Sequence, residues 1–195
     1  RRPAHLVERA LRSLPQPLQD GAAAPSGSGA LVAGGLDAGD ASVGDVHFVT
    51  PTSQALRGSL PSARHDAAAA TVGGTTYVFG GGDAVHQLDD VVALRNGSPV
   101  VGHLPEPASD VSAATIGRTA YVVGGYTGTA WLNTILAWQP GRTPRVVARL
   151  PQALRYSAVT AVDGKLVIAG GSLQSGTASR TVLAFDPATG RVRAI

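Results

Sequence analysis

Apolar, small and polar positions follow one another in a single pattern that occurs four times along the chain. Each copy opens on Leu-Pro, passes through a polar loop into a strand of small residues, crosses a two-residue turn, and ends in a bulkier apolar strand closed by Gly-Gly. The first glycine of that pair follows the leucine by 20 residues in every copy, without a gap. The opening leucines, which are 46, 44 and 46 residues apart, are Leu14, Leu60, Leu104 and Leu150. A fixed period of this size predicts a propeller or a solenoid.

Each repeat is predicted to form four antiparallel strands, A to D, joined as a meander. In the second copy we place them at 66–72, 75–80, 90–94 and 99–103. The glycine pair at 73–74, between A and B, suits a two-residue hairpin whose central positions need a positive φ angle. The pattern therefore predicts an all-β fold of four-stranded antiparallel blades.

The strands of a repeat differ in side-chain size. Strand A is rich in alanine, as at Ala67–Ala70, although alanine is a poor strand former. In a radial array the innermost strands converge on the axis, where only small side chains fit. Strands B and C carry the bulky apolar residues, so we expect both faces of a sheet to be covered by neighbours. The glycines that end strand B lack a Cβ and let the adjacent sheet approach closely.

The repeats define one propeller segment, for which four blades are at the low end of the usual range of about four to eight. We therefore expect an incomplete propeller, which further blades or a second copy would complete. Residues 1–13 align with the segment before each later Leu-Pro and are interpreted as the last strand of a preceding blade. A short amphipathic helix is the competing interpretation, since Leu6, Ala10 and Leu14 recur at helical spacing. The four blades are expected at about 14–59, 60–103, 104–149 and 150–195.

This pattern, an apolar strand ending in Gly-Gly after a loop that opens on Leu-Pro, resembles the kelch repeat of β-propellers. The resemblance covers residues 14–195 and recurs four times in register. It implies a kelch-type propeller like the central domain of galactose-oxidase-like proteins. Kelch blades usually carry a tryptophan in strand D, whereas Trp138 lies in strand C. This departure suggests a divergent, bacterial-type branch.

Composition narrows the classes of function. The chain has 195 residues, 44% of them hydrophobic, and no cysteine. A disulfide framework, a thiolate metal site and the Tyr–Cys copper cofactor of some kelch oxidases are therefore excluded within it. The net charge of +3, carried by scattered arginines, does not indicate a nucleic-acid partner. We expect no cofactor, no membrane span and no signal peptide in this segment; the compartment, bacterial cell envelope or cytoplasm, stays open.

The meander places the D–A loops and the B–C loops on one face, around the mouth of the central channel, and loops on a rigid scaffold are where binding usually occurs. The B–C loops vary in length whereas the A–B turns do not, which marks this face as the binding face. By resemblance to peptide-binding kelch domains, arginines in the D–A loops would contact acidic ligands. The candidate binding residues are Arg64, His65, Asp66, Asp110, Arg155, Tyr156, Tyr126 and Trp131.

One column of the D–A loops, six residues after the leucine, holds Asp20, Asp66, Asp110 and Tyr156. Two interpretations of the aspartates stay open: carboxylates that cap backbone N–H groups in every repeat, or contacts to a ligand. Tyr156 differs from the aspartates at this position. A residue that the fold requires should recur in every repeat, so the tyrosine is available to contact a ligand. The two aromatic residues of the third B–C loop either stack on a sugar or peptide, or pack against the next blade.

We predict a non-enzymatic binding module whose ligand is a protein, a peptide or a glycan. The alternative is a carbohydrate-active enzyme, resembling an epimerase, a mutarotase or an oxidase, with acid and base groups at the channel. Arg64, His65 and Asp66 are the residues that could supply those groups. A purely structural array is the third interpretation.

Two further sequence features contain residue types that bind metals or phosphates elsewhere. Asp83, His86, Asp89 and Asp90 form a string that matches no metal-binding spacing, so we interpret it as solvated loop charge and predict no metal site. Each Gly-Gly ends a strand and is not followed by a helix, which excludes phosphate-binding and dinucleotide-binding loops.

Overall fold

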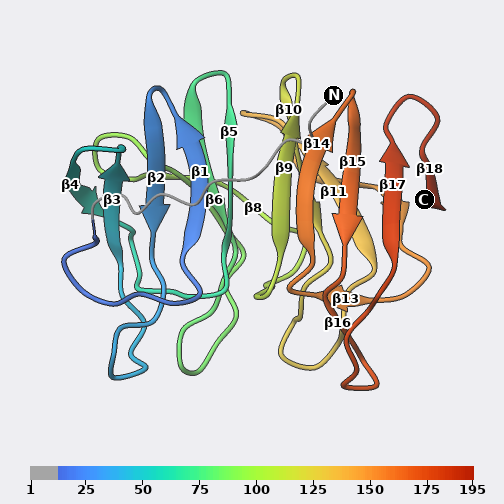
Figure 1. Cartoon of the computed structure of the whole chain (residues 1–195), viewed down its shortest axis with the longest axis horizontal. Helices are drawn as coiled ribbons and strands as arrows, with labels where there is room; N and C mark the ends of the chain where they lie inside the picture. The colour runs from blue at the N-terminus through green and yellow to red at the C-terminus, as the bar shows by residue number, and fades with distance from the viewer. Residues whose placement is uncertain (1–12) are drawn as a thin grey trace, which may run out of the picture.

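The computed structural model describes residues 13–195, and this part of the chain consists of strands, turns and loops. Four antiparallel sheets of four strands follow one another, each a meander in chain order, and stand side by side in Figure 1. The predicted all-β architecture is confirmed. The strand and the competing helix predicted before Leu14 lie outside the described residues. None of the described residues belongs to a helix that could cross a membrane.

The strands of the second sheet begin and end within two residues of their predicted positions. The A strands are β1 (Ala22–Ser26), β5 (Ala68–Val72), β9 (Ser112–Ile116) and β14 (Ala158–Val162). The B strands are β2 (Gly29–Ala33), β6 (Thr75–Phe79), β10 (Thr119–Val123) and β15 (Lys165–Ala169). The C strands are β3 (Asp45–Val49), β7 (Asp90–Ala93), β11 (Thr134–Trp138) and β17 (Val182–Asp186). The D strands are β4 (Gln54–Ser59), β8 (Val100–His103), β12 (Arg145–Arg149) and β18 (Arg191–Ala194). A two-stranded ribbon pairs β13 (Leu154–Arg155) with β16 (Ser172–Leu173).

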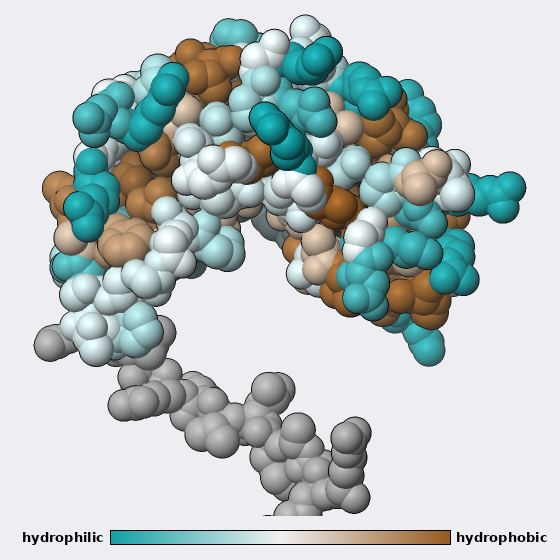
Figure 2. Space-filling view, turned by 90° about the horizontal axis from the view of Figure 1, so that it is seen from above, coloured by the Kyte–Doolittle hydropathy of each residue, from teal (hydrophilic) through white to brown (hydrophobic). Residues whose placement is uncertain are grey.

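The sheets are arranged radially, with the A strands innermost. Strand β1 lies against β5, β5 against β9, and β9 against β14. Seen from above, the molecule is an arc around an open hollow rather than a closed ring (Figure 2). The fold is therefore an incomplete propeller, in which the alanine-rich strands occupy the crowded inner positions as expected.

The two ends of the sheets differ in their connections. The tight A–B and C–D turns lie at one end, here called the turn face, and the D–A and B–C loops lie at the other, here called the loop face (Figure 1). Gly73 and Gly74 have φ angles of 58° and 82°, as the predicted hairpin requires. The short turns give the turn face a similar backbone in every repeat, whereas the longer loops allow the loop face to differ between repeats.

Aromatic side chains fill the interfaces between the later sheets. Trp138 of β11 packs edge-on against Tyr77 and Phe79 of β6, with ring centroids 4.7 and 5.4 Å apart. Phe185 of β17 packs in the same way against Tyr121 of β10 at 5.7 Å. All five side chains are at most 8% exposed. Apolar burial of this kind contributes roughly 25 cal/mol per Å², so the inter-sheet clusters are the main source of stability.

The Gly-Gly pairs dock each sheet onto the next. A Cβ added to Gly80 or Gly124 would lie 2.3 Å from the carbonyl oxygen of Ala108 or Leu154 in the following repeat. Gly81 donates its N–H to the same Ala108 carbonyl at 2.9 Å. The close approach expected from the sequence is confirmed, and it explains why a side chain at the first glycine would separate neighbouring sheets.

Candidate functional site

Four residues, one from each D–A loop, form a rim around the channel mouth on the loop face: Asp20, Asp66, Asp110 and Tyr156. Each adopts the left-handed conformation, with φ between 55° and 57°. The N–H of Asp66, Asp110 and Tyr156 donates to the carbonyl of the preceding rim residue, at 3.0, 2.8 and 3.2 Å. Aspartate tolerates this conformation better than most residues. The aspartate therefore recurs because the backbone of this position adopts the left-handed conformation. This reason is neither the capping of N–H groups nor the ligand contact expected from the sequence.

Asp66 and Asp110 bring two carboxyl groups together in the middle of the rim. The side chain of Asp110 is 1% exposed and that of Asp66 is 13% exposed. Burial, reinforced by the charge of Asp110, raises the pKa of Asp66 to about 7. Within the described residues, Asp110 Oδ1 accepts no hydrogen bond. Either a proton on Asp66 or a donor from a ligand can satisfy that oxygen.

Arg155 covers the carboxyl pair from the side of the fourth sheet. Its Nε donates to Oδ2 of Asp110, and its Nη2 lies 3.2 Å from the hydroxyl oxygen of Tyr156. Its guanidinium carbon lies 4.5, 5.0 and 5.2 Å from the ring centroids of Tyr126, Trp131 and Tyr156. Cation–π contacts of this kind hold the arginine in place. The structure therefore brings these five predicted residues into one cluster.

Tyr156 and His65 complete the cluster around Asp66. The Tyr156 hydroxyl donates to Oδ2 of Asp66 at 3.4 Å. Burial and the charge of Asp110 raise the pKa of Tyr156 to about 12, so the phenol remains a donor at neutral pH. His65 places Nε2 3.7 Å from Asp66 and Nδ1 2.9 Å from the hydroxyl of Ser42. Ser42 was not predicted, because a lone serine in a B–C loop carries no distinguishing signal.

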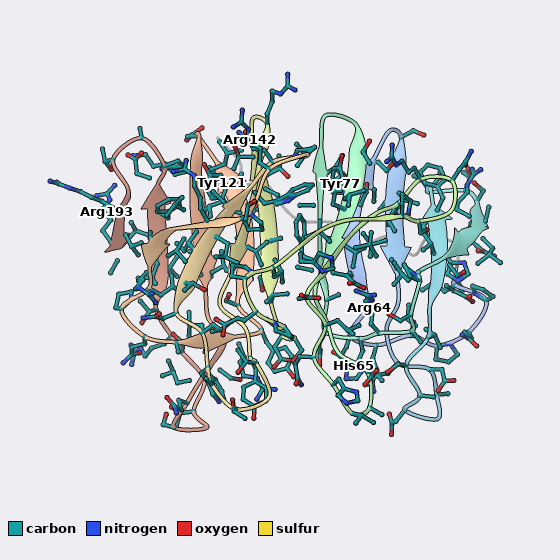
Figure 3. All side chains as sticks on the ribbon, turned by 180° about the vertical axis from the view of Figure 1, so that it is seen from behind. Arg64, His65, Tyr77, Tyr121, Arg142 and Arg193 are labelled. Carbon is teal, nitrogen blue, oxygen red and sulfur yellow. The ribbon has the colours of Figure 1, made fainter. Side chains whose placement is uncertain are left out.

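Arg64, predicted to bind a ligand on the loop face, is instead buried. Its side chain is 0% exposed, and Figure 3 shows it within the layer of strands while His65 lies among the loops. Nη1 donates to the carbonyl of Gly80 at 3.1 Å, and Nη2 donates to Asp90 at 3.0 Å and to the Ser62 hydroxyl at 2.7 Å. A side chain four residues after the leucine points between the sheets, so Arg64 ties strand ends together and is left out of the binding surface.

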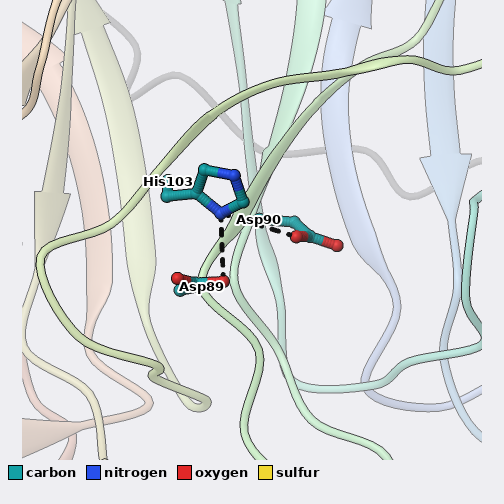
Figure 4. A group of neighbouring side chains, drawn as sticks. All are labelled: Asp89, Asp90 and His103. Atoms are coloured by element: carbon teal, nitrogen blue, oxygen red, sulfur yellow. Dashed lines mark hydrogen bonds and ion pairs between the residues drawn. The ribbon is translucent and has the colours of Figure 1, made fainter.

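A second group of titratable side chains, Asp89, Asp90 and His103, lies where β7 begins and β8 ends (Figure 4). His103 Nδ1 is 3.2 Å from Asp89 Oδ1 and 3.8 Å from Asp90 Oδ1. The spacing would suit a cation, but Asp90 is already paired with Arg64. Because Arg64 supplies positive charge to this group, we interpret Asp89, Asp90 and His103 as ion pairing between the two strands.

The rest of the predicted charge string serves its own loop. Asp83 Oδ1 accepts the N–H groups of Val85 and His86, each at 2.7 Å. Such a carboxylate caps a turn. The string thus divides into a loop cap and an ion-paired group.

Comparison with known proteins finds kelch motifs in the sequence and a similar fold in a solved structure. The model of the kelch motif matches residues 63–93 and 153–195. A solved structure titled "Structure of YjhT" superposes with a TM-score of 0.80 at 16% identity, covering 95% of this chain and 67% of that one. No curated protein matches the sequence. Kelch motifs thus lie in the second and fourth repeats, and the fold is an incomplete propeller, as the resemblance implied. A kelch-type propeller fold supports an interaction type of module.

Proposed function

We propose that the loop face is a binding surface for a protein segment, a peptide or a glycan that carries hydrogen-bond donors. The observation that supports this most is Asp110 Oδ1, which is buried and accepts no hydrogen bond among the described residues, on a carboxylate paired with an arginine that three aromatic rings surround. A buried acceptor without a partner costs about 1–3 kcal/mol, which a ligand donor would recover. Tyr156, which is 50% exposed, and the partly exposed Tyr126 and Trp131 offer ring faces for stacking.

The charges of the site favour a ligand that carries hydrogen-bond donors over a ligand that carries acidic groups. The resemblance implied that arginines meet acidic groups, but Arg64 is buried and Arg155 is paired with Asp110. The remaining rim charge is that of Asp20 and of Asp66 once it ionises. Amines, guanidinium groups and sugar hydroxyls therefore complement the rim, whereas a carboxylate would be repelled.

Titration calorimetry with three probes tests this proposal: an oligolysine peptide, an oligoglutamate peptide and a neutral chito-oligosaccharide. We expect oligolysine or the oligosaccharide to bind, and Asp110→Asn and Trp131→Ala to weaken that binding about tenfold or more, which corresponds to about 1.4 kcal/mol. Arg193→Ala, on an exposed position of β18, is the matched control and should leave binding unchanged. Binding of oligoglutamate alone, or binding that neither site variant alters, would contradict the proposal.

A carbohydrate-active enzyme is the second candidate, because a carboxyl group with a raised pKa lies beside a second carboxyl group. Asp66 has a pKa of about 7, so near neutral pH it can either give or take a proton, as a general acid or base must. Polarimetry of aldose mutarotation measures this activity directly. We expect acceleration over buffer that Asp66→Asn abolishes; rates equal to buffer for the intact protein would remove this candidate.

We also propose that further blades, or a second copy of the chain, cover the open faces of the arc. Within residues 13–195 the first and last sheets each have a neighbouring sheet on one face only. Val162 of β14 is 49% exposed, and on the same face of the sheet Val167 of β15 and Val182 of β17 are partly exposed. An apolar face of this kind favours association. Sedimentation velocity over a range of concentrations distinguishes a monomer from a dimer; a monomer at all concentrations would exclude the second copy.

A further inference from the structure

The interfaces between sheets are filled unequally on the turn face. Trp138 fills the second interface, and the equivalent residue of the third interface is Phe185, which pairs with Leu166 as Trp138 pairs with Ala120. Phenylalanine is smaller than tryptophan. A cavity of about 540 Å³ lies beside Phe185, between the third and fourth sheets. This volume is within the range of small-molecule sites.

The cavity has an apolar floor and a basic mouth. Tyr121 and Phe185 form the floor, where they are 8% and 1% exposed. Arg142 and Arg145 line the exposed mouth. Figure 3 shows Tyr121 and Arg142 at the same end of the molecule, opposite His65. The cavity therefore lies on the turn face, away from the rim.

The charge of this cavity is not balanced by its own lining. Among residues 13–195, no aspartate or glutamate lines it. Neither Arg142 nor Arg145 belongs to an ion pair among the described residues. The positive charge of Arg145 also reaches the floor, where it opposes the rise that burial causes in the pKa of Tyr121. An anion is the ligand that this field attracts.

We propose that the cavity between the third and fourth sheets binds a small organic anion, with its apolar body against Tyr121 and Phe185 and its carboxylate or phosphate oxygens held by Arg142 and Arg145. Guanidinium groups bind both kinds of oxyanion through paired N–H donors. In the neighbouring interface the larger side chain of Trp138 occupies the equivalent position. The smaller Phe185 leaves space in the third interface for a ligand. The site is independent of the binding proposed for the loop face.

Heteronuclear NMR titration of the 195-residue chain tests the site with four probes: 3-phenylpropionate, phenyl phosphate, 3-phenylpropylamine and inorganic phosphate. We expect one or both aromatic anions to bind, the amine not to bind, and inorganic phosphate to bind at least tenfold more weakly than phenyl phosphate. Saturating shifts should appear at Tyr121 and Phe185. A tenfold preference for either aromatic anion identifies the oxyanion that the site takes.

Three variants sharpen the test. Arg142→Gln and Arg145→Gln should each weaken the anion about tenfold, and Phe185→Trp, which copies the filled interface, should abolish binding. Arg193→Gln on β18 is the matched control for loss of one exposed positive charge and should have no effect. The arginine variants change exposed side chains, so they decide the question even if Phe185→Trp fails to fold. Equal binding of the amine, equal loss in Arg193→Gln, or no anion binding at millimolar concentration would overturn the proposal.

Discussion

The D–A loops of the second and fourth repeats, residues 60–66 and 150–156, contain an arginine in adjacent positions of the same frame. Arg64 stands four residues after its leucine and Arg155 stands five after. The backbone is equivalent, because the carbonyls of Arg64 and Leu154 accept the N–H of Gly35 and Gly125 at 2.7 and 2.9 Å. A shift of one residue therefore sends one arginine between the sheets and the other to the channel mouth. Register within the loop decides whether an arginine belongs to the framework or to the site.

The largest effect should come from removing the framework arginine. Arg64→Ala leaves Asp90 and the Gly80 carbonyl without their charged donor, and losing one member of a buried pair costs about 3–5 kcal/mol. We expect about 3 kcal/mol here, since Asp90 is 22% exposed and can be partly rehydrated. Urea unfolding measures the change. A loss below about 1 kcal/mol would show that the arginine is not a structural element.

The next effect is on the dependence of stability on pH. The folded pKa of Asp66 is about 7 and its ordinary value is 3.8, so between these values the folded state holds a proton that the unfolded state has released. Stability is therefore highest below pH 4 as far as this group is concerned, and falls as the pH rises to about 7. Because the mouth is partly open to water, we expect a fall of about 1–2 kcal/mol.

Thermal unfolding at pH 3.5 to 8 measures this fall as the difference between the original chain and Asp66→Asn, which removes the titrating group. The difference should shrink towards zero below pH 4 and grow up to about pH 7. A difference that does not vary with pH would show that Asp66 has an ordinary pKa.

Removing the arginine of the site should cost less than removing Arg64. Arg155 is 24% exposed, and its loss opens the Asp110 carboxylate to water rather than leaving it enclosed. We expect Arg155→Ala to lower stability by about 1 kcal/mol, from lost cation–π contacts and one ion pair. Urea unfolding beside Arg64→Ala gives the comparison directly. Equal losses for the two variants would remove the distinction between framework and site.

The smallest effect is expected when the second repeat is made to resemble the fourth. Leu154 and Thr181 occupy the positions of Arg64 and Asp90, so the double variant Arg64→Leu with Asp90→Thr copies an arrangement that the chain already uses. Replacing a whole buried ion pair by packed residues is often neutral. We expect a change within about 1 kcal/mol, and a double-mutant cycle in urea should show strong coupling between the two sites.

The repeat frame made much of this molecule predictable, because backbone demands recur in every copy. The glycine pairs and the rim column follow from close approach and positive φ angles, and both stand at constant distances from Leu-Pro. The direction of a side chain within a loop does not follow from loop membership, which is why Arg64 was misplaced. A signal was present: Leu18, Ala108 and Leu154, its counterparts, are all apolar. A column of apolar residues marks an interior position even where one member is charged.

The candidate site was predictable as a set of residues but not as an arrangement. Asp66 and Asp110 share a column, so their closeness across repeats follows from the frame. The packing of Tyr126 and Trp131 on Arg155 depends on side chains that the B–C loop of equal length in the second repeat lacks, since Gly82 and Gln87 occupy the equivalent positions there. The raised pKa of Asp66 depends on burial, which composition does not report.

The row of backbone amides along the rim also sets the size of the opening. Each step from one module to the next on that side is a single peptide contact of 2.8 to 3.2 Å, whatever side chains stand there. The width of the opening therefore depends on the number of sheets in the propeller. Substitutions at the rim change the chemistry of the opening but not its width. Selection by size and selection by chemistry can thus vary independently in such a scaffold.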